Sequence, residues 1–208
     1  MPQLKIDLHV HTEVSPDAHT KRENLPSIIK QRGIDGVAIT EHNRFQPSNL
    51  DALILPGLEV SSRDGHIVAL GVQEVIPRGL PADETIQLIH AKNGIAIIAH
   101  PYDPVCECIK ITRLKTRPDA VETINADALS FYFSKRFATR DAIAFKLPQV
   151  GGSDSHIPQT IGDAYTVVDA NSASVADVLE AIRAGRVRAE GRATSIRNKL
   201  QKLSYKFR

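Results

Sequence analysis

Histidines recur in this 208-residue sequence at the ends of short apolar segments, usually beside a carboxylate. The segment Asp7-Leu8-His9-Val10-His11 places His9 and His11 two residues apart, and alternate residues of a β-strand share a face. Two imidazoles on one face of an apolar strand are costly to bury unless something binds them both. The spacing therefore predicts that His9 and His11 bind one metal ion.

Six further segments place ligand-type residues at strand ends or in the turns beside them. These residues are Asp17, His42 after Glu41, Glu59, His66, His100, and Asp154 with His156. Without metals, such a set would crowd carboxylates and imidazoles together at a large desolvation cost. Coordinated together, the nine groups would neutralise two or three divalent cations, and such clusters are typical of metal or catalytic sites. We expect His90, inside a predicted helix, to lie outside the set.

The elements that must position these residues form an alternating pattern. Short, β-branched segments bounded by Gly, Pro or Asp predict strands at 4–10, 36–40, 53–60, 66–72, 95–100, 120–125, 148–152 and 164–168. Helical spacing predicts helices over 23–32, 83–92, 127–145 and 174–184, the last with Ser174 as N-cap and Gly185 after its end. The alternation predicts an α/β domain with a mainly parallel sheet or barrel, whose chemistry lies at the strands' carboxyl ends.

The composition fits one globular domain, with 42% hydrophobic and 24% charged residues and a net charge of +2. No stretch approaches the roughly 20 apolar residues of a membrane span, and the first residues lack the apolar run of a signal peptide. We therefore expect a cytoplasmic protein. Cys106 and Cys108 have no second pair, so we expect them to be reduced and to play no part in metal binding.

Five motifs in order resemble those of a known family. They are Asp-Leu-His-Val-His-Thr (7–12), Thr-Glu-His-Asn (40–43), Gly-Leu-Glu-Val (57–60), His-Pro (100–101) and Gly-Gly-Ser-Asp-Ser-His (151–156). The order closely resembles the PHP family, the polymerase and histidinol phosphatase phosphoesterases. Residues 119–168 resemble the PHP-associated region of its small stand-alone members. The resemblance implies a distorted (β/α)7 barrel, which we expect over residues 1–185, with up to three metals at the ends of its strands.

The resemblance also implies how the metals are held. One metal would be held by His9, His11, Glu59 and Asp154, a second by Asp17, His42 and His156, and a third by His66 and His100, with Glu59 bridging to it. Glu41 departs from the family, which usually has Asp there. The chain is also too short for the capping domain that some small-nucleotide phosphatases of the family insert, so we expect an open pocket.

Imidazole and carboxylate ligands together favour zinc, manganese or iron over magnesium or calcium. A water that bridges two such ions has its pKa lowered from about 15.7 towards about 7, which provides a hydroxide for attack on a phosphate ester. Besides Glu59, the candidate catalytic residues are Arg44 and Arg63, which would balance phosphoryl charge, and His19, a candidate acid for the leaving group. Asn125 would either contact the substrate or the ligands, or simply close a turn.

Basic residues concentrate at the C-terminus, with eight Lys or Arg against Glu190 between Arg186 and Arg208. Within this tail, 186–208, helical spacing predicts an amphipathic helix. Its apolar residues are Ile196, Leu200, Leu203 and Phe207, and its basic residues are Arg197, Lys199, Lys202 and Lys206. We expect the apolar stripe to pack on the barrel, so that removing the helix would destabilise the protein. The alternative is that its charges bind nucleic-acid phosphates; we expect no membrane partner, since the stripe is narrow and has no Trp.

The sequence therefore predicts a metal-dependent phosphatase whose partner is a small phosphate ester or a nucleotide. A second hypothesis is an RNA or DNA exonuclease that uses the same metals, favoured by the basic tail and the open pocket. A third is a non-catalytic nucleic-acid-binding protein of the same fold, which the complete ligand set disfavours.

Overall fold

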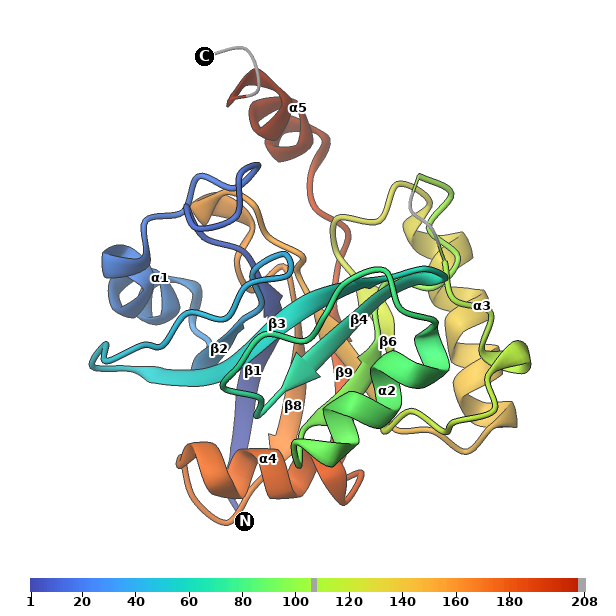
Figure 1. The fold of residues 1–208 in the computed structure, drawn as a ribbon. Coiled ribbons are helices and arrows are strands. Elements are labelled where there is room, and N and C mark those ends of the chain that lie inside the picture. Colours follow the sequence, from blue (N-terminus) through green and yellow to red (C-terminus); the bar gives the residue numbers. More distant parts are fainter. Residues whose placement is uncertain (106–107, 206–208) are drawn as a thin grey trace.

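The computed structural model describes residues 1–105 and 108–205, and one mixed sheet organises them (Figure 1). The strands are β1 (Gln3–Val10), β2 (Gly36–Ile39), β3 (Leu53–Ser62), β4 (Gly65–Leu70), β5 (Ile95–Ile98), β6 (Ala120–Asn125), β7 (Gln149–Gly152), β8 (Ala164–Asp169) and β9 (Val187–Gly191). The α-helices are α1 (Leu25–Arg32), α2 (Ala82–Ala91), α3 (Phe131–Ala144), α4 (Val175–Arg183) and α5 (Ile196–Tyr205). The 3-10 helices are η1 (Arg22–Asn24), η2 (Ile111–Arg113) and η3 (Pro158–Thr160). None of the helices in these ranges has the length and apolar character needed to span a bilayer.

The strand order is β7-β6-β5-β4-β3-β2-β1-β8-β9. Parallel pairs join β1 to β2, β2 to β3, β5 to β6 and β6 to β7, and the other four pairs are antiparallel. The sheet is therefore less parallel than the alternating pattern predicted. One reason is that only Arg63 and Asp64 separate β3 from β4, which makes a hairpin and leaves no chain for the crossover that a parallel pair requires.

The sheet curls until its first and seventh strands meet, which nearly closes a barrel. Val10, at the end of β1, forms a parallel bridge with Ser155, just after β7. The backbone N–H of His11 donates to the carbonyl of Ser155 at 2.9 Å, and that of Asp154 donates to the carbonyl of His9 at 2.8 Å. The expected α/β fold with a distorted barrel is thus confirmed.

Apolar side chains fill the barrel, and α4 closes one end of it. Leu8 of β1, Leu70 of β4 and Ile97 of β5 pack in one core with Val178 and Ile182 of α4. Helix α4 begins and ends as predicted, with Ser174 accepting from Asp177 N at its start and Gly185 in the left-handed conformation after its end. Helix α1 packs against the outside of β1 and β2, and α2 and α3 cover the outside of the central strands. Figure 1 shows α4 near the N-terminus and α5 at the opposite end of the barrel.

Helix α3 begins at Phe131, later than the predicted start at residue 127. Residues 125–128 instead form a turn centred on Asn125, whose Oδ1 accepts from the backbone N–H groups of Asp127 and Ala128, both at 3.0 Å.

The basic tail differs most from its prediction. Residues 187–191 form β9, which pairs with β8, so the helix is confined to Ile196–Tyr205. The expectation that the apolar stripe of this helix packs on the barrel is wrong for its described residues, because Ile196, Leu200 and Leu203 are 78%, 62% and 50% exposed. Lys206 and Phe207 lie outside the described residues. The physical reason is that Lys199 and Lys202 of α5 donate hydrogen bonds to Asp127 and to backbone carbonyls of the barrel.

Candidate metal centre

Ligand-type side chains gather at the end of the barrel opposite α4. They come from the ends of β1 (His9, His11), β2 (His42), β5 (His100) and β7 (Asp154, His156), from within β3 (Glu59), and from the loop after β1 (Asp17). Strand β4 runs antiparallel to β3, so His66 near its start lies at the same end. The strand directions alone therefore bring the predicted residues to one edge.

A β-bulge in β1 aims both of its histidines into the barrel. Leu8 packs in the interior core, as do alternate residues before it, whereas Val10 packs outside against α1. The pairing of β1 with β2 shifts between Asp7 and Val10. The extra residue reverses which face of the strand successive side chains occupy. Leu8 faces the interior, and beyond the bulge His9 and His11 face the interior as well. Bulges beside functional sites re-aim side chains in this way.

Glu59 is the centre of the cluster and is only 1% exposed. Its Oε1 lies 3.0 Å from His66 Nδ1, 3.1 Å from His100 Nε2 and 3.4 Å from His9 Nε2, and its Oε2 lies 2.7 Å from His42 Nδ1 and 3.5 Å from His11 Nε2. The two oxygens thus face different sets of imidazoles, as the oxygens of a carboxylate that bridges two metals do.

Two aspartates complete the cluster. Asp154 Oδ1 lies 3.3 Å from His11 Nε2 and 3.5 Å from His9 Nε2, and Asp17 lies 3.3 Å from His156 Nε2 and 3.6 Å from His42 Nε2. Within the described ranges, ligand atoms that lie within 4.8 Å of one another form three groups: His9, His11 and Asp154; Glu59, His66 and His100; and His11, His42 and His156. The structure therefore brings all nine predicted ligands together, with His11 between two of the groups.

The partners of the ring nitrogens of His9 and His11 make this cluster fit metal ions. His9 Nδ1 lies 3.1 Å from Glu122 Oε1, and His11 Nδ1 lies 3.3 Å from Ser15 Oγ. When Nδ1 donates outward, Nε2 carries its lone pair inward. Both Nε2 atoms are buried and have no hydrogen-bond partner among the described residues. Buried polar atoms rarely stay unsatisfied, and metal-bound histidines are held in this manner.

Two buried glutamates, Glu122 and Glu41, accept hydrogen bonds that fix the positions of the predicted ligands. Besides His9, Glu122 accepts from the backbone N–H of His100 at 2.7 Å. Glu41 accepts hydrogen bonds from both Thr12 and Ser15, and Ser15 Oγ in turn lies 3.1 Å from the backbone N of His42. The glutamate that departs from the family pattern thus acts on the ligands through Ser15.

Two of the predicted ligands have unusual backbone conformations. His100 has φ of 27° and Asp154 has φ of 53°, a region that residues other than Gly rarely adopt. Such conformations cost about 1–3 kcal/mol each and persist where the surroundings fix them, commonly at functional sites. Here Glu122 holds the N–H of His100, and the carbonyl of His9 holds that of Asp154.

The carboxylates and imidazoles shift one another's pKa values. Burial alone would raise the pKa of Glu59, but the charge of His9 and hydrogen bonds from three other histidines hold it well below its usual range. Burial, together with the charges of His156 and His42, lowers the pKa of His11 to about 3. Burial also acts to lower the pKa of His42, but Asp17 and Glu59 raise it to about 10. The carboxylates thus attract positive charge, which divalent cations would supply in place of protons.

The candidate catalytic side chains outside the ligand set lie in different surroundings. Arg44 lines a cavity of about 420 Å³ together with His42. Arg63 is exposed in the turn between β3 and β4. His19 is also exposed, and its ring stacks on that of Tyr205 with 4.6 Å between centroids.

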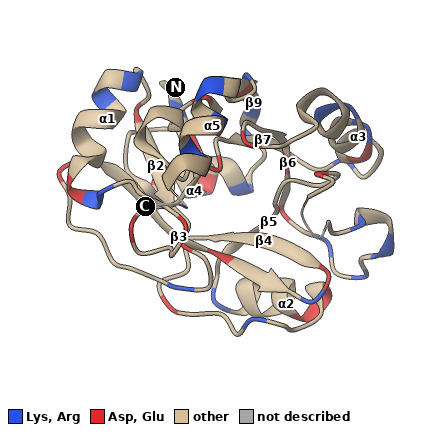
Figure 2. Ribbon diagram, turned by 90° about the horizontal axis from the view of Figure 1, so that it is seen from above, with Lys and Arg blue, Asp and Glu red and all other residues tan. Residues whose placement is uncertain are grey.

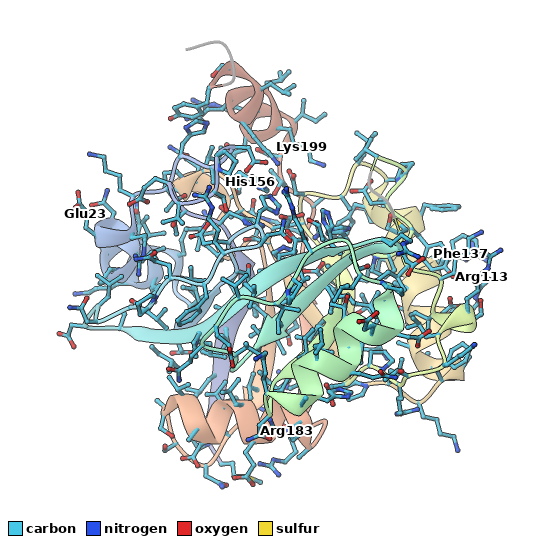
Figure 3. All side chains as sticks on the ribbon, viewed as in Figure 1. Glu23, Arg113, Phe137, His156, Arg183 and Lys199 are labelled. Atoms are coloured by element: carbon cyan, nitrogen blue, oxygen red, sulfur yellow. The ribbon has the colours of Figure 1, made fainter. Side chains whose placement is uncertain are left out.

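Two lysines of α5 lie at the cluster. Lys202 Nζ is 2.5 Å from Asp127 Oδ2 and 3.3 Å from His156 Nδ1. Lys199 Nζ donates to the carbonyls of Asp127 and Ala128 at 2.9 and 2.8 Å. Figure 3 labels Lys199 directly beneath α5, close above His156. Seen from above, α5 lies over this end of the barrel with its basic positions near acidic ones (Figure 2).

Sequence reasoning did not identify Glu122, Asp127 or Lys202 as parts of this site. Glu122 left a signal, because it is a charged residue inside the short, otherwise uncharged segment 120–125. Nothing in the sequence indicated Lys202, because the apolar stripe of the helix, not its lysines, was expected to face the barrel.

The structure shows the contacts of Asn125, for which the sequence allowed two roles, and of Cys108. Besides closing its turn, Asn125 donates from Nδ2 to Glu122 Oε2 at 2.9 Å and to Asp154 Oδ2 at 3.2 Å, so it has both of the roles considered. Cys108 Sγ contacts the carbonyl of Asp103 at 3.1 Å. Cys106 lies outside the described residues.

Comparisons with known sequences agree with this geometry. Residues 134–187 match the family described as PHP-associated. An uncharacterized protein of Methanocaldococcus jannaschii is 33% identical in an alignment 141 positions long, which covers 59% of this chain and 82% of that protein. A probable phosphatase of Caldicellulosiruptor saccharolyticus is 26% identical in an alignment 197 positions long, which covers 76% of this chain and 82% of the relative.

Solved structures share the fold. A two-domain protein of Bacteroides vulgatus that contains a predicted PHP-like metal-dependent phosphoesterase has a TM-score of 0.70 and 16% identity, covering 98% of this chain and 70% of the other. A lesion-specific endonuclease of Pyrococcus furiosus has a TM-score of 0.64 and 14% identity, covering 90% and 58%. At these identities the likeness shows the fold alone.

Proposed function

This chain belongs to the PHP family of metal-dependent phosphoesterases, and from that membership we propose that it hydrolyses small phosphate esters or nucleotides. The observation that carries the proposal is the cluster of nine ligand-type side chains around Glu59, with the buried Nε2 atoms of His9 and His11 facing carboxylates. Relatives named as probable phosphatases support the same activity.

We propose two or three zinc, manganese or iron ions in this cluster. The residues that would hold them are His9, His11, Asp17, His42, Glu59, His66, His100, Asp154 and His156. Bound there, such ions supply Lewis acidity towards the phosphoryl oxygens and a water of lowered pKa. The chain's own part is orientation: Glu122 and Ser15 keep two imidazoles in the tautomer that binds metal, and Glu59 joins the groups of ligands.

The cavity beside His42 is the proposed entrance for substrate. Its volume is about 420 Å³, and Pro16, Asn43, Arg44 and Arg78 contribute to its lining. A guanidinium there suits phosphoryl oxygens, because Arg binds them through charge-assisted hydrogen bonds. Arg63 and His19 are weaker candidates, since in the described parts of the chain neither side chain hydrogen-bonds a predicted ligand.

An exonuclease activity on RNA or DNA is the alternative, and the fold likeness to an endonuclease favours it. The structure of the basic tail supports nuclease activity less than the sequence of the tail did. Lys199 and Lys202 point to the barrel, where Asp127 and backbone carbonyls accept their hydrogen bonds, and this leaves fewer cations for a nucleic-acid backbone.

The test compares substrates on one metal-loaded preparation. We expect p-nitrophenyl phosphate and nucleoside monophosphates to be hydrolysed with higher kcat/KM than labelled oligonucleotides, RNA or DNA. Turnover of oligonucleotides with none of the small esters would overturn the proposal in favour of the exonuclease. Oligonucleotide binding without any turnover would favour the non-catalytic protein.

A further inference from the structure

Helix α5 lies against the barrel through its polar side. Asn198, Lys199, Gln201, Lys202 and Tyr205 are partly buried, while the apolar Ile196, Leu200 and Leu203 are exposed. Burial of these three apolar side chains therefore does not determine how the described part of the helix, 196–205, is oriented. The contacts of its described residues include those of Lys199 with two carbonyls, Lys202 with Asp127, and Tyr205 with the ring of His19. These contacts direct the basic side chains of α5 towards the predicted ligands.

The ammonium group of Lys202 is one imidazole ring away from the proposed metals. It lies 3.3 Å from Nδ1 of His156, whose Nε2 on the far side of the ring lies 3.3 Å from Asp17. Lys202 is only 21% exposed, and α5 thus holds a cation beside the cluster, partly shielded from water. In such surroundings a charge interacts more strongly than it does in open solvent.

Lys202 also has hydrogen-bond donors to spare. An ammonium group has three donors, and Asp127 Oδ2 accepts one of them at 2.5 Å. His156 Nδ1 is not a free acceptor when its N–H donates to the carbonyl of Asp154, which lies 2.8 Å away. The contact between Lys202 and His156 is then a close approach rather than a hydrogen bond. As far as the described residues show, two donors then remain for an anion that enters the site.

We propose that Lys202 binds a phosphoryl oxygen of the substrate, and that α5 is a substrate-binding element which covers one side of the metal site. This inference rests on the proposed function, which it deepens by assigning the phosphate its cationic partner. With α5 on the side of His156, the rest of the substrate extends towards the cavity beside His42. The substrate class is a phosphate monoester, whose terminal phosphate can accept from the ammonium group of Lys202 and still has oxygens for metal ions that the predicted ligands would hold.

The test uses metal-loaded protein, with inorganic phosphate as the probe. Lys202→Gln should weaken phosphate binding in calorimetry about tenfold or more, the effect of losing one hydrogen bond between charged groups. The KM for p-nitrophenyl phosphate should rise by a similar factor with a smaller change in kcat. Lys202→Arg should restore most of the binding. The matched control is Arg197→Gln, which removes the same charge from an exposed position of the same helix.

Metal content and melting temperature accompany each variant. Unchanged phosphate affinity in Lys202→Gln, or an equal loss in Arg197→Gln, would overturn the assignment of Lys202. A loss of bound metal in Lys202→Gln would overturn it too, because the lysine would then act on the metal site instead of the phosphate. Failure of the proposed function looks different: the wild-type protein would hydrolyse no phosphate ester, while calorimetry with phosphate would still test Lys202.

Discussion

Glu59 contacts five histidines through its two carboxylate oxygens, and no other single change removes as much from the cluster. Glu59→Gln keeps the volume and removes the charge. We expect the rate of phosphate ester hydrolysis to fall at least about 100-fold, the upper end of the effect seen for residues one shell further out. Bound metal, measured by elemental analysis, should fall with it.

The control for Glu59 is His90, which lies on α2 and pairs with Asp119 Oδ2 at 2.9 Å. His90→Gln should leave both metal content and turnover near those of the wild type. Similar, mild effects of the two substitutions would show that Glu59 is not a bridging ligand.

Glu122 acts on the ligands without being one of those predicted. Glu122→Gln weakens its hydrogen bonds with His9 Nδ1 and the N–H of His100, so we expect metal affinity to fall about 10- to 100-fold. The measurement is competition with a metal-binding indicator. Glu74→Gln is the matched control, because Glu74 is exposed and pairs only with Lys92 in the described structure. Equal metal affinities of the two variants would show that Glu122 does not support the metal ligands.

Sequence spacing identified the ligands well because they follow strand ends. His9 and His11 were paired by strand alternation, although a bulge was needed to turn them inward, and no spacing rule predicts a bulge. Glu122 was missed because a buried carboxylate inside a strand is interpretable only when its partners, His9 and the N–H of His100, are known.

At the scale of elements, segment types were easier to predict than their pairing. All eight predicted strands are present, because each is a short apolar run with clear boundaries. The direction of β4 depends on the two-residue turn after β3, and β9 was missed because its exposed, charged residues lack the apolar pattern of the others. Edge strands with one solvated face carry little hydrophobic signal.

The orientation of α5 gives a prediction for its removal. A protein that lacks residues 195–208 loses no side chain counted as buried in the described part of α5, so its melting temperature should change by less than about 5 °C. The KM for small phosphate esters should rise because Lys202 is gone. Thermal melts and steady-state kinetics measure the two quantities. A drop in melting temperature of about 10 °C or more would restore the earlier expectation that the helix stabilises the barrel.

At the scale of the whole molecule, the two ends of the barrel have different tasks. Helix α4 closes one end with apolar side chains and stabilises the core. At the other end, buried carboxylates and imidazoles replace the apolar contacts, and α5 adds cations from the tail. The alternation of strands and helices predicted the barrel, but the contact between a tail and a loop more than 70 residues apart was beyond any local pattern.

The most direct test of the account is the dependence of turnover on added metal. Protein stripped with a chelator should not hydrolyse p-nitrophenyl phosphate, and stepwise addition of manganese or zinc should restore turnover until two to three ions are bound per chain. Elemental analysis of the same samples gives the ion count. Turnover that persists in the stripped protein, or a fully stripped protein that binds no manganese or zinc, would contradict the account.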